Sequence, residues 1–172
     1  VLFRSAPYQK DRVTTFINPE AADPESVFNV DQAEVSIGTG GTWGKGYMQG
    51  TQSQLGFLRV QHTDFIFSML TEEMGLMFGS LPVLFLMGFI LLRILRVSQL
   101  TPDPAGKFMT AGIAAILFFQ TVVSVGMNVR IMPVTGLTLP FVSYGGSSLV
   151  TLFIAIGVVQ SVLMRHRKQD FG

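Results

Sequence analysis

The sequence predicts an all-α, polytopic membrane protein, and its composition and apolar segments lead to that prediction. Hydrophobic residues make up 48% of the chain and charged residues only 13%, about half the charged share of soluble domains. Three apolar segments approach or reach the length that crosses a bilayer core of roughly 30 Å. A soluble helical bundle is disfavoured because its helices would carry a polar face at 3.6-residue spacing, which is almost absent here.

The apolar segments give the expected transmembrane helices, and the polar stretches give the loops and the tail. The expected helices are residues 74–95, 108–127 and 148–164. The expected connections are an extracytoplasmic loop at 1–73 with a short helix at 63–73, a cytoplasmic loop at 96–107, an extracytoplasmic re-entrant loop at 128–147 and a cytoplasmic tail at 165–172.

The distribution of basic residues sets the expected orientation. Lys and Arg gather around the connection after the first span and in the tail, at Arg93, Arg96, Lys107, Arg165, Arg167 and Lys168. The positive-inside rule places both regions in the cytoplasm. Segment 1–73 has five basic against nine acidic residues and is expected outside, as is 128–147, where Arg130 is the only charge. The alternation is self-consistent across the three spans.

Several features exclude other classes. The chain has no cysteine, which excludes disulfides and thiolate metal sites. The two histidines, His62 and His166, lie on opposite sides of the expected topology, so we predict no metal site from them. The chain lacks an initiating Met and a signal-peptide pattern, so we expect it to be an internal or C-terminal piece of a larger protein.

Residues 139–148 (LPFVSYGGSS) predict irregular backbone at a membrane boundary. Pro140 has no backbone N–H, and Gly145 and Gly146 allow a sharp turn. Next to lipid, such backbone is stable only where protein buries it or where it lines a watery cavity. The segment is therefore either a re-entrant loop that handles a polar substrate or a tight turn between two membrane helices.

Residues 37–50 contain six glycines, with Trp43 and Lys45 among them. Backbone N–H groups freed by glycine, together with a lysine, are compatible with a phosphate cradle. The pattern is not a Walker motif, however, and a flexible surface loop is the favoured alternative.

A short helix is predicted after residue 63. If Thr63 caps it, Asp64 lies in its first turn, where the helix dipole favours a carboxylate. Helical spacing then aligns Asp64, Ser68 and Glu72 on one stripe. From these residues alone, Asp64 is either a functional carboxylate or simply a stabiliser of the helix start, and the second interpretation is favoured.

Ordered motifs between residues 37 and 148 resemble those of the SEDS proteins (shape, elongation, division and sporulation), the RodA/FtsW family of cell-wall polymerases. The motifs are GKG at 44–46, GTQSQL at 50–55, HTDFIF at 62–67 with the glutamates at 72 and 73, MPVTG at 132–136 and LPFVSYGGS at 139–147. The GTQSQ motif is more similar to that of RodA than to that of FtsW. The chain departs from the family pattern at Arg59-Val60, Ser124 and Arg130.

The resemblance implies a peptidoglycan glycosyltransferase of the bacterial cytoplasmic (inner) membrane, which polymerises lipid II during cell elongation and cell-shape maintenance or division. The family fold has about ten membrane helices, so this chain would supply the last three and the loop before them, and we expect it to be inactive alone. The implied partners are a class B penicillin-binding protein as transpeptidase, lipid II, undecaprenyl pyrophosphate and membrane lipids. No nucleic acid is expected.

The resemblance also implies site residues. The family's essential loop aspartate falls on Asp64. Forming a β-1,4 bond from an α-linked lipid pyrophosphate inverts the anomeric centre, and the acceptor hydroxyl needs a general base, which we assign to Asp64. The leaving pyrophosphate needs charge neutralisation rather than a proton. The expected substrate-binding residues are Lys45, Arg59 and Arg130 for phosphate, His62, Thr63 and Glu72 for orienting Asp64 or the sugars, and Ser143 and Tyr144 in the late loop. A divalent cation such as Mg²⁺ is a candidate to share the phosphate-binding task.

Two alternatives to the enzyme remain open. A flippase for the lipid-linked precursor would also have a polar cavity between helices. A non-catalytic scaffold for the penicillin-binding protein would not need Asp64 at all. A base on the outer loop favours the enzyme, because translocation needs no base there. We also expect residues 140–147 to fold against the Asp64 helix and to form one outward-facing cavity with it.

Overall fold

The computed structural model describes residues 16, 24–46 and 64–169, and it is all-helical over these ranges. Its elements are α2 (Pro24–Gly40), α4 (Ile66–Gly75), the π-helical turn η2 (Leu76–Ser80), α5 (Leu81–Leu100), α6 (Pro104–Asn128) and α7 (Gly146–Gln169). No strand occurs in the described ranges, and the predicted all-α class is confirmed.

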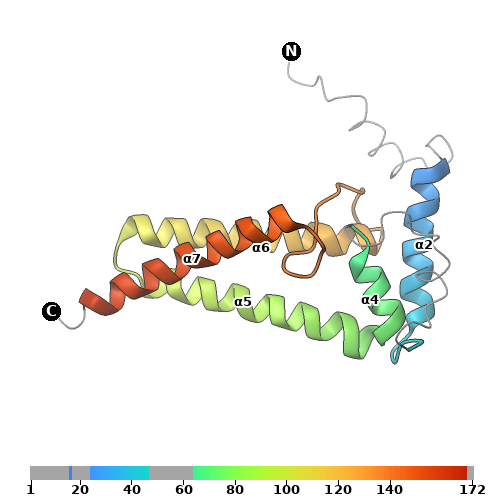
Figure 1. Cartoon of the computed structure of the whole chain (residues 1–172), viewed down its shortest axis with the longest axis horizontal. Coiled ribbons are helices and arrows are strands. Elements are labelled where there is room, and N and C mark those ends of the chain that lie inside the picture. Colours follow the sequence, from blue (N-terminus) through green and yellow to red (C-terminus); the bar gives the residue numbers. More distant parts are fainter. Residues whose placement is uncertain (1–15, 17–23, 47–63, 170–172) are drawn as a thin grey trace, which may run out of the picture.

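Three helical stretches are long and apolar enough to cross a membrane. They are Ile66–Leu100, which joins α4, η2 and α5, then Pro104–Asn128 and Gly146–Arg165. All three are longer than the apolar runs from which they were predicted, since polar residues at their ends continue the helices. Helices α5 and α6 run side by side, α7 crosses them at an angle, and α2 lies across one end of the group (Figure 1). We call the end formed by α2, α4 and the last turns of α6 the α2 end.

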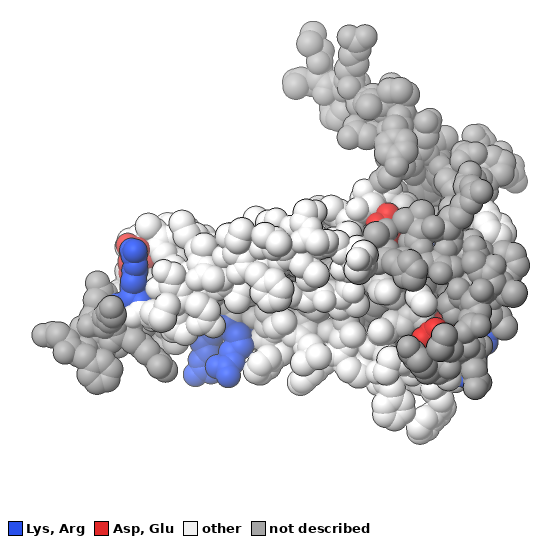
Figure 2. All heavy atoms as spheres, viewed as in Figure 1, with Lys and Arg blue, Asp and Glu red and all other residues white. Residues whose placement is uncertain are grey.

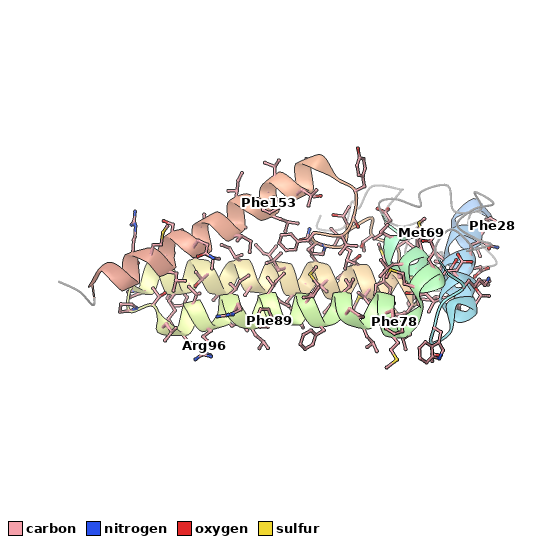
Figure 3. The ribbon with its side chains drawn as sticks, turned by 60° about the horizontal axis from the view of Figure 1, so that its bottom comes forward. Phe28, Met69, Phe78, Phe89, Arg96 and Phe153 are labelled. Atoms are coloured by element: carbon pink, nitrogen blue, oxygen red, sulfur yellow. The ribbon has the colours of Figure 1, made fainter. Side chains whose placement is uncertain are left out.

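The core of the helix group is a single apolar cluster from three helices. Its buried members are Ile94 of α5, Ala114 and Leu117 of α6, and Leu152 and Val159 of α7. Outside this cluster, large apolar side chains stand out from the helices, among them Phe89 on α5 and Phe153 on α7 (Figure 3). An apolar surface of this extent suits lipid or neighbouring membrane helices rather than water.

The connection between α5 and α6 is shorter than the expected loop 96–107. Helix α5 continues to Leu100 and α6 begins at Pro104, so only residues 101–103 are outside the helices. Pro102 disfavours helical backbone at Thr101, which is extended with ψ 120° and ends α5. The Asp103 carboxylate accepts a hydrogen bond from the Gly106 amide (3.0 Å) and caps α6.

Helix α2 was missed by the sequence prediction, which expected an extracytoplasmic loop here and only one short helix, at residues 63–73. Pro24 is the first residue of this helix, a position that tolerates its missing N–H. Ala33, Ser36 and Gly40 form the buried face of α2 at helical spacing. Because these residues are small, the apolar pattern that normally identifies a helix face is weak here.

The helix that follows Asp64 also differs from the expected range 63–73. It begins at Ile66, with Phe65 at the N-cap position and no side-chain cap. Its far end does not stop before the membrane helix, because α4 passes through η2 directly into α5. Gly75, at the junction, has φ +77°, a backbone conformation that glycine adopts without strain.

Candidate functional site

The glycine-rich segment 40–46 wraps around the junction between α4 and η2. Four backbone hydrogen bonds join the two parts of the chain. The N–H donors and their carbonyl acceptors are Lys45 to Glu72 (3.0 Å), Gly46 to Glu73 (3.0 Å), Leu76 to Gly41 (2.9 Å) and Met77 to Thr42 (3.1 Å). These bonds run in both directions and fix the segment against the helix. They supply partners for carbonyl groups near the C-terminal end of α4 and for amide groups at the start of η2.

The same pairing explains the glycines. A Cβ atom on Gly40 would lie only 2.8 Å from the Cα atom of Glu72, so only glycine fits beside α4 there. The N–H groups of Lys45 and Gly46 donate to protein carbonyls and are therefore not available to an anion. The phosphate-cradle interpretation is wrong for these two amides. The segment instead packs closely against the backbone of α4.

The Lys45 ammonium group lies beside the Glu72 carboxylate. Their Nζ and Oε1 atoms are 3.5 Å apart. The Glu72 side chain is fully buried, at 0% exposure, whereas that of Lys45 is 28% exposed. A buried carboxylate requires a compensating charge or hydrogen bonds, and Lys45 supplies a charge. Two of the residues predicted from the sequence are thus brought together.

Asp64 lies in a turn just before α4 and is half-buried. The expected place in the first helical turn is wrong by two residues, because α4 begins at Ile66. The next residue, Phe65, is 4% exposed and forms a small cluster with Ala33 of α2, against which Val30 and Val134 pack. The Asp64 turn is therefore held against both α2 and the connection that follows α6.

Asn128, the last residue of α6, bonds directly to this turn. Its Nδ2 group donates to the backbone carbonyl of Asp64 (3.0 Å) and to that of Ser124 (2.8 Å). Its Oδ1 atom accepts from the Ser68 amide (3.2 Å) and the Ser68 hydroxyl (2.6 Å). All the hydrogen-bonding capacity of this buried amide is used. The end of α6 is thereby bonded to the start of α4.

Arg130 follows two residues later and points to α2. Its Nη1 atom lies 2.7 Å from Oδ1 of Asp31 and 3.2 Å from Oε2 of Glu34. Its backbone has φ +58°, which is uncommon for a residue other than glycine. This predicted phosphate-binding residue is thus part of a surface ion-pair group with two carboxylates.

The connection between α6 and α7 returns to the helix group. Within it, the Ser143 hydroxyl accepts a hydrogen bond from the Leu139 amide (2.9 Å), and Pro140 is fully buried. Phe141 joins the apolar cluster of α5, α6 and α7 and meets the Phe153 ring edge-on at 6.2 Å. Tyr144, by contrast, is 82% exposed.

The expected fold of residues 140–147 against the Asp64 helix stays a prediction. Earlier in the connection, Val134 packs against the small cluster of Ala33 and Phe65 beside the Asp64 turn. The Phe141 side chain belongs to the cluster between the long helices.

The charges divide between the two ends of the molecule. The described groups at the α2 end are mainly acidic: Asp31, Glu34, Asp64, Glu72 and Glu73, with Lys45 and Arg130. Those of α5 and the opposite end are mainly basic: Arg93, Arg96, Lys107 and Arg165, with Asp103. Figure 2 shows basic side chains on the part of the viewed face away from α2.

The remaining predicted site residues, Arg59, His62 and Thr63, lie outside the described residues. Within the ranges that are described, His, Asp and Glu side chains form no group of three that could hold a metal ion.

Sequence reasoning missed Asn128. The available signal was its position, since an amide at the end of a long apolar helix is costly to bury and is usually satisfied by a specific partner. Its partners, however, are 60 and 64 residues away in the chain, at Ser68 and Asp64. No local pattern points to them.

Comparisons with known proteins agree with the family resemblance. The peptidoglycan glycosyltransferase MrdB of Escherichia coli (strain K12) is 42% identical over 161 residues, which cover 94% of this chain and 43% of that protein. The peptidoglycan glycosyltransferase RodA of Treponema pallidum (strain Nichols) is 42% identical over 160 residues, covering 93% and 37%. Stage V sporulation protein E of Bacillus subtilis (strain 168) is 39% identical over 161 residues, covering 94% and 43%.

A solved structure is also similar. It is described as showing structural coordination of polymerization and crosslinking by a peptidoglycan synthase complex. One of its chains matches with a TM-score of 0.72 at 33% identity, over 94% of this chain and 42% of that chain.

The chain spans less than half the length of these relatives. Its three apolar helical stretches and its relatives make it part of a multi-pass protein of the bacterial inner membrane. A profile of the FtsW, RodA and SpoVE proteins, described as cell cycle protein, matches residues 1–168. The chain therefore belongs to the FtsW/RodA/SpoVE family.

Proposed function

We propose that the full-length parent of this chain is a peptidoglycan glycosyltransferase that polymerises lipid II during elongation and shape maintenance. The observation that carries the proposal is the Asp64 turn, a carboxylate-bearing segment fixed between α2, α4 and the end of α6. The names of relatives at 42% identity support the reaction class.

In the proposed reaction, the acceptor sugar hydroxyl attacks the anomeric carbon of a lipid-linked donor. The new glycosidic C–O bond forms as the bond to the pyrophosphate breaks, and the electron pair leaves with the lipid pyrophosphate. Asp64 takes the hydroxyl proton as general base. Among the described residues, the hydrogen bond to Asp64 is made to its backbone carbonyl and not to its carboxylate.

The leaving pyrophosphate gains charge and requires cationic partners. Of the described candidates, we favour Lys45 over Arg130. Arg130 already faces two carboxylates, so its group carries a net negative charge, which opposes the approach of an anion.

The proposed partners are lipid II as substrate, undecaprenyl pyrophosphate as leaving group and a class B penicillin-binding protein as transpeptidase. The similarity to a chain from a peptidoglycan synthase complex supports the last of these. This chain supplies only part of the whole polymerase, so the activity is proposed for the full-length parent.

The test is Asp64→Asn in the purified full-length parent, measured by polymerisation of labelled lipid II. The amide keeps the size of the side chain but cannot accept the proton, so the rate falls by about 10² to 10⁴. Glu73→Gln, a carboxylate on α4 itself, is the matched control and keeps most of the activity. Near-normal polymerisation by Asp64→Asn would defeat the proposal and favour a flippase or scaffold.

A further inference from the structure

Asn128 is a candidate for a role in the reaction beyond the residues already proposed. It is 1% exposed, and it makes four hydrogen bonds, to Asp64, Ser68 and Ser124. Three of these four bonds leave its own helix and reach the Asp64 turn and the first turns of α4. Most of the other polar groups buried in α6 bond only within that helix, as Thr121 does to the Leu117 carbonyl.

The chemistry of the site requires an amide at this position. The Nδ2 group faces two carbonyl oxygens, and the Oδ1 atom faces two donors. An aspartate would place a carboxylate oxygen against the carbonyls of Asp64 and Ser124. An alanine would leave the Asp64 carbonyl and the Ser68 hydroxyl without this partner. Only asparagine matches both sides at this length.

Among the residues that the structure describes, few others fix the Asp64 turn. It lies outside the helix, and no side-chain cap secures the start of α4. On one side Phe65 is anchored in the small cluster with Ala33. On the other side the Asp64 carbonyl is fixed by Asn128. The bond to Asn128 therefore acts on the backbone of the proposed base itself.

We propose that Asn128 is a positioning residue, which holds the backbone of Asp64 at the end of α6 so that the carboxylate reaches the acceptor hydroxyl. This inference rests on the proposed function. A shift of about 1 Å in a reacting group is enough to lower a rate about 10²-fold. Loss of the Asn128 amide permits such a shift without removing any group that touches the substrate.

The test uses purified full-length parent, with polymerisation rates measured over a range of lipid II concentrations. Asn128→Ala lowers kcat about 10²-fold and changes KM less than about twofold, because binding groups stay in place. Thr121→Val is the matched control, since it removes a buried hydroxyl from the same helix but no bond to α4. It stays within about twofold of the parent. Equal kcat losses in the two variants would overturn the proposal.

A second measurement separates positioning of Asp64 from a general loosening of the fold. In the Asp64→Asn background, Asn128→Ala has no further effect if it acts through Asp64. A further loss of about 10²-fold in that background would contradict the proposal. If the Asp64→Asn enzyme is too slow for this comparison, the separate effects of Asn128→Ala on kcat and on KM distinguish positioning of Asp64 from loosening of the fold.

The experiment distinguishes misfolding of Asn128→Ala from an error in the assignment of Asp64 as base. If Asn128→Ala does not fold, Ser68→Ala removes a single bond to Oδ1 and serves instead. It lowers kcat about twofold to tenfold, and this loss disappears in the Asp64→Asn background; a loss that persists there opposes the proposal. If Asp64→Asn itself polymerises normally, the proposed base is wrong, whatever Asn128 variants do.

Discussion

Gly44 and Gly75 approach each other so closely that neither position has room for a side chain. A Cβ atom on Gly44 would lie 2.5 Å from the Gly75 nitrogen, and both residues have positive φ, +79° and +77°. The contact lies where the glycine-rich segment crosses the start of η2. The two segments therefore meet through their backbone atoms rather than through side chains.

We therefore expect Gly44→Ala to destabilise the protein through both strain and overlap. The left-handed backbone alone costs an alanine about 1 to 2 kcal/mol, and the overlap adds to it. Gly41→Ala is the control, because Gly41 has φ +56° but nothing within 4 Å of the added atom. Thermal unfolding of the detergent-solubilised parent measures both. Equal losses for the two variants would mean that the backbone contact relaxes easily.

The pair formed by Lys45 and Glu72 gives a second prediction. Lys45→Met leaves the buried Glu72 carboxylate without this cation, at a cost of up to about 3 to 5 kcal/mol. Adding Glu72→Gln removes the buried charge, so the double variant is more stable than Lys45→Met alone. The double-mutant cycle is measured by thermal unfolding. A double variant no more stable than Lys45→Met would show that the carboxylate does not depend on Lys45.

Arg130 combines a strained backbone with two exposed ion pairs, and two substitutions separate these effects. Both Arg130→Ala and Arg130→Gly lose the pairs with Asp31 and Glu34, each worth about 0.2 to 1 kcal/mol. Only glycine relieves the strain at φ +58°, so Arg130→Gly is more stable than Arg130→Ala by about 1 kcal/mol. Unfolding of both variants at low and high salt checks this. The reverse order would mean that the positive φ carries no cost.

Orientation in the membrane remains a prediction from the basic residues, and cysteine labelling tests it. Ser98, at 5% exposure, is unsuitable as a labelling site, but Gln99 in the last turn of α5 is exposed. An impermeant maleimide added to intact cells labels Thr135→Cys in the connection after α6. It labels Gln99→Cys only after the membrane is opened. Any cysteine elsewhere in the parent is replaced first. The opposite labelling pattern would invert the topology.

The sequence was sufficient for the long helices, because their apolar runs exceed the length of ordinary core helices. It failed at α2, where the buried face consists of small residues such as Ala33 and Gly40. It also failed at Asn128, because the bond to Asp64 joins residues 64 positions apart. Local periodicity reports on neighbours within a few turns and carries no information about such contacts.

The role of the glycine-rich segment illustrates the same limit. Its composition suited both an anion site and a surface loop. The amides of Lys45 and Gly46 instead donate to carbonyl groups of α4. The distinction depends on which carbonyls lie nearby in space. That information comes from the packing of 40–46 against Glu72 and Glu73.

The bond between Asp64 and Asn128 also has a consequence for biosynthesis. The ribosome delivers Asp64 before it makes α6, so this turn leaves the translation machinery while its partner is still unmade. The bond that holds the backbone of the proposed base can therefore form only after α5 and α6 have both been made, with their connecting residues 101–103 between them. A nascent chain halted after Leu100 would carry the aspartate but not the asparagine that holds it.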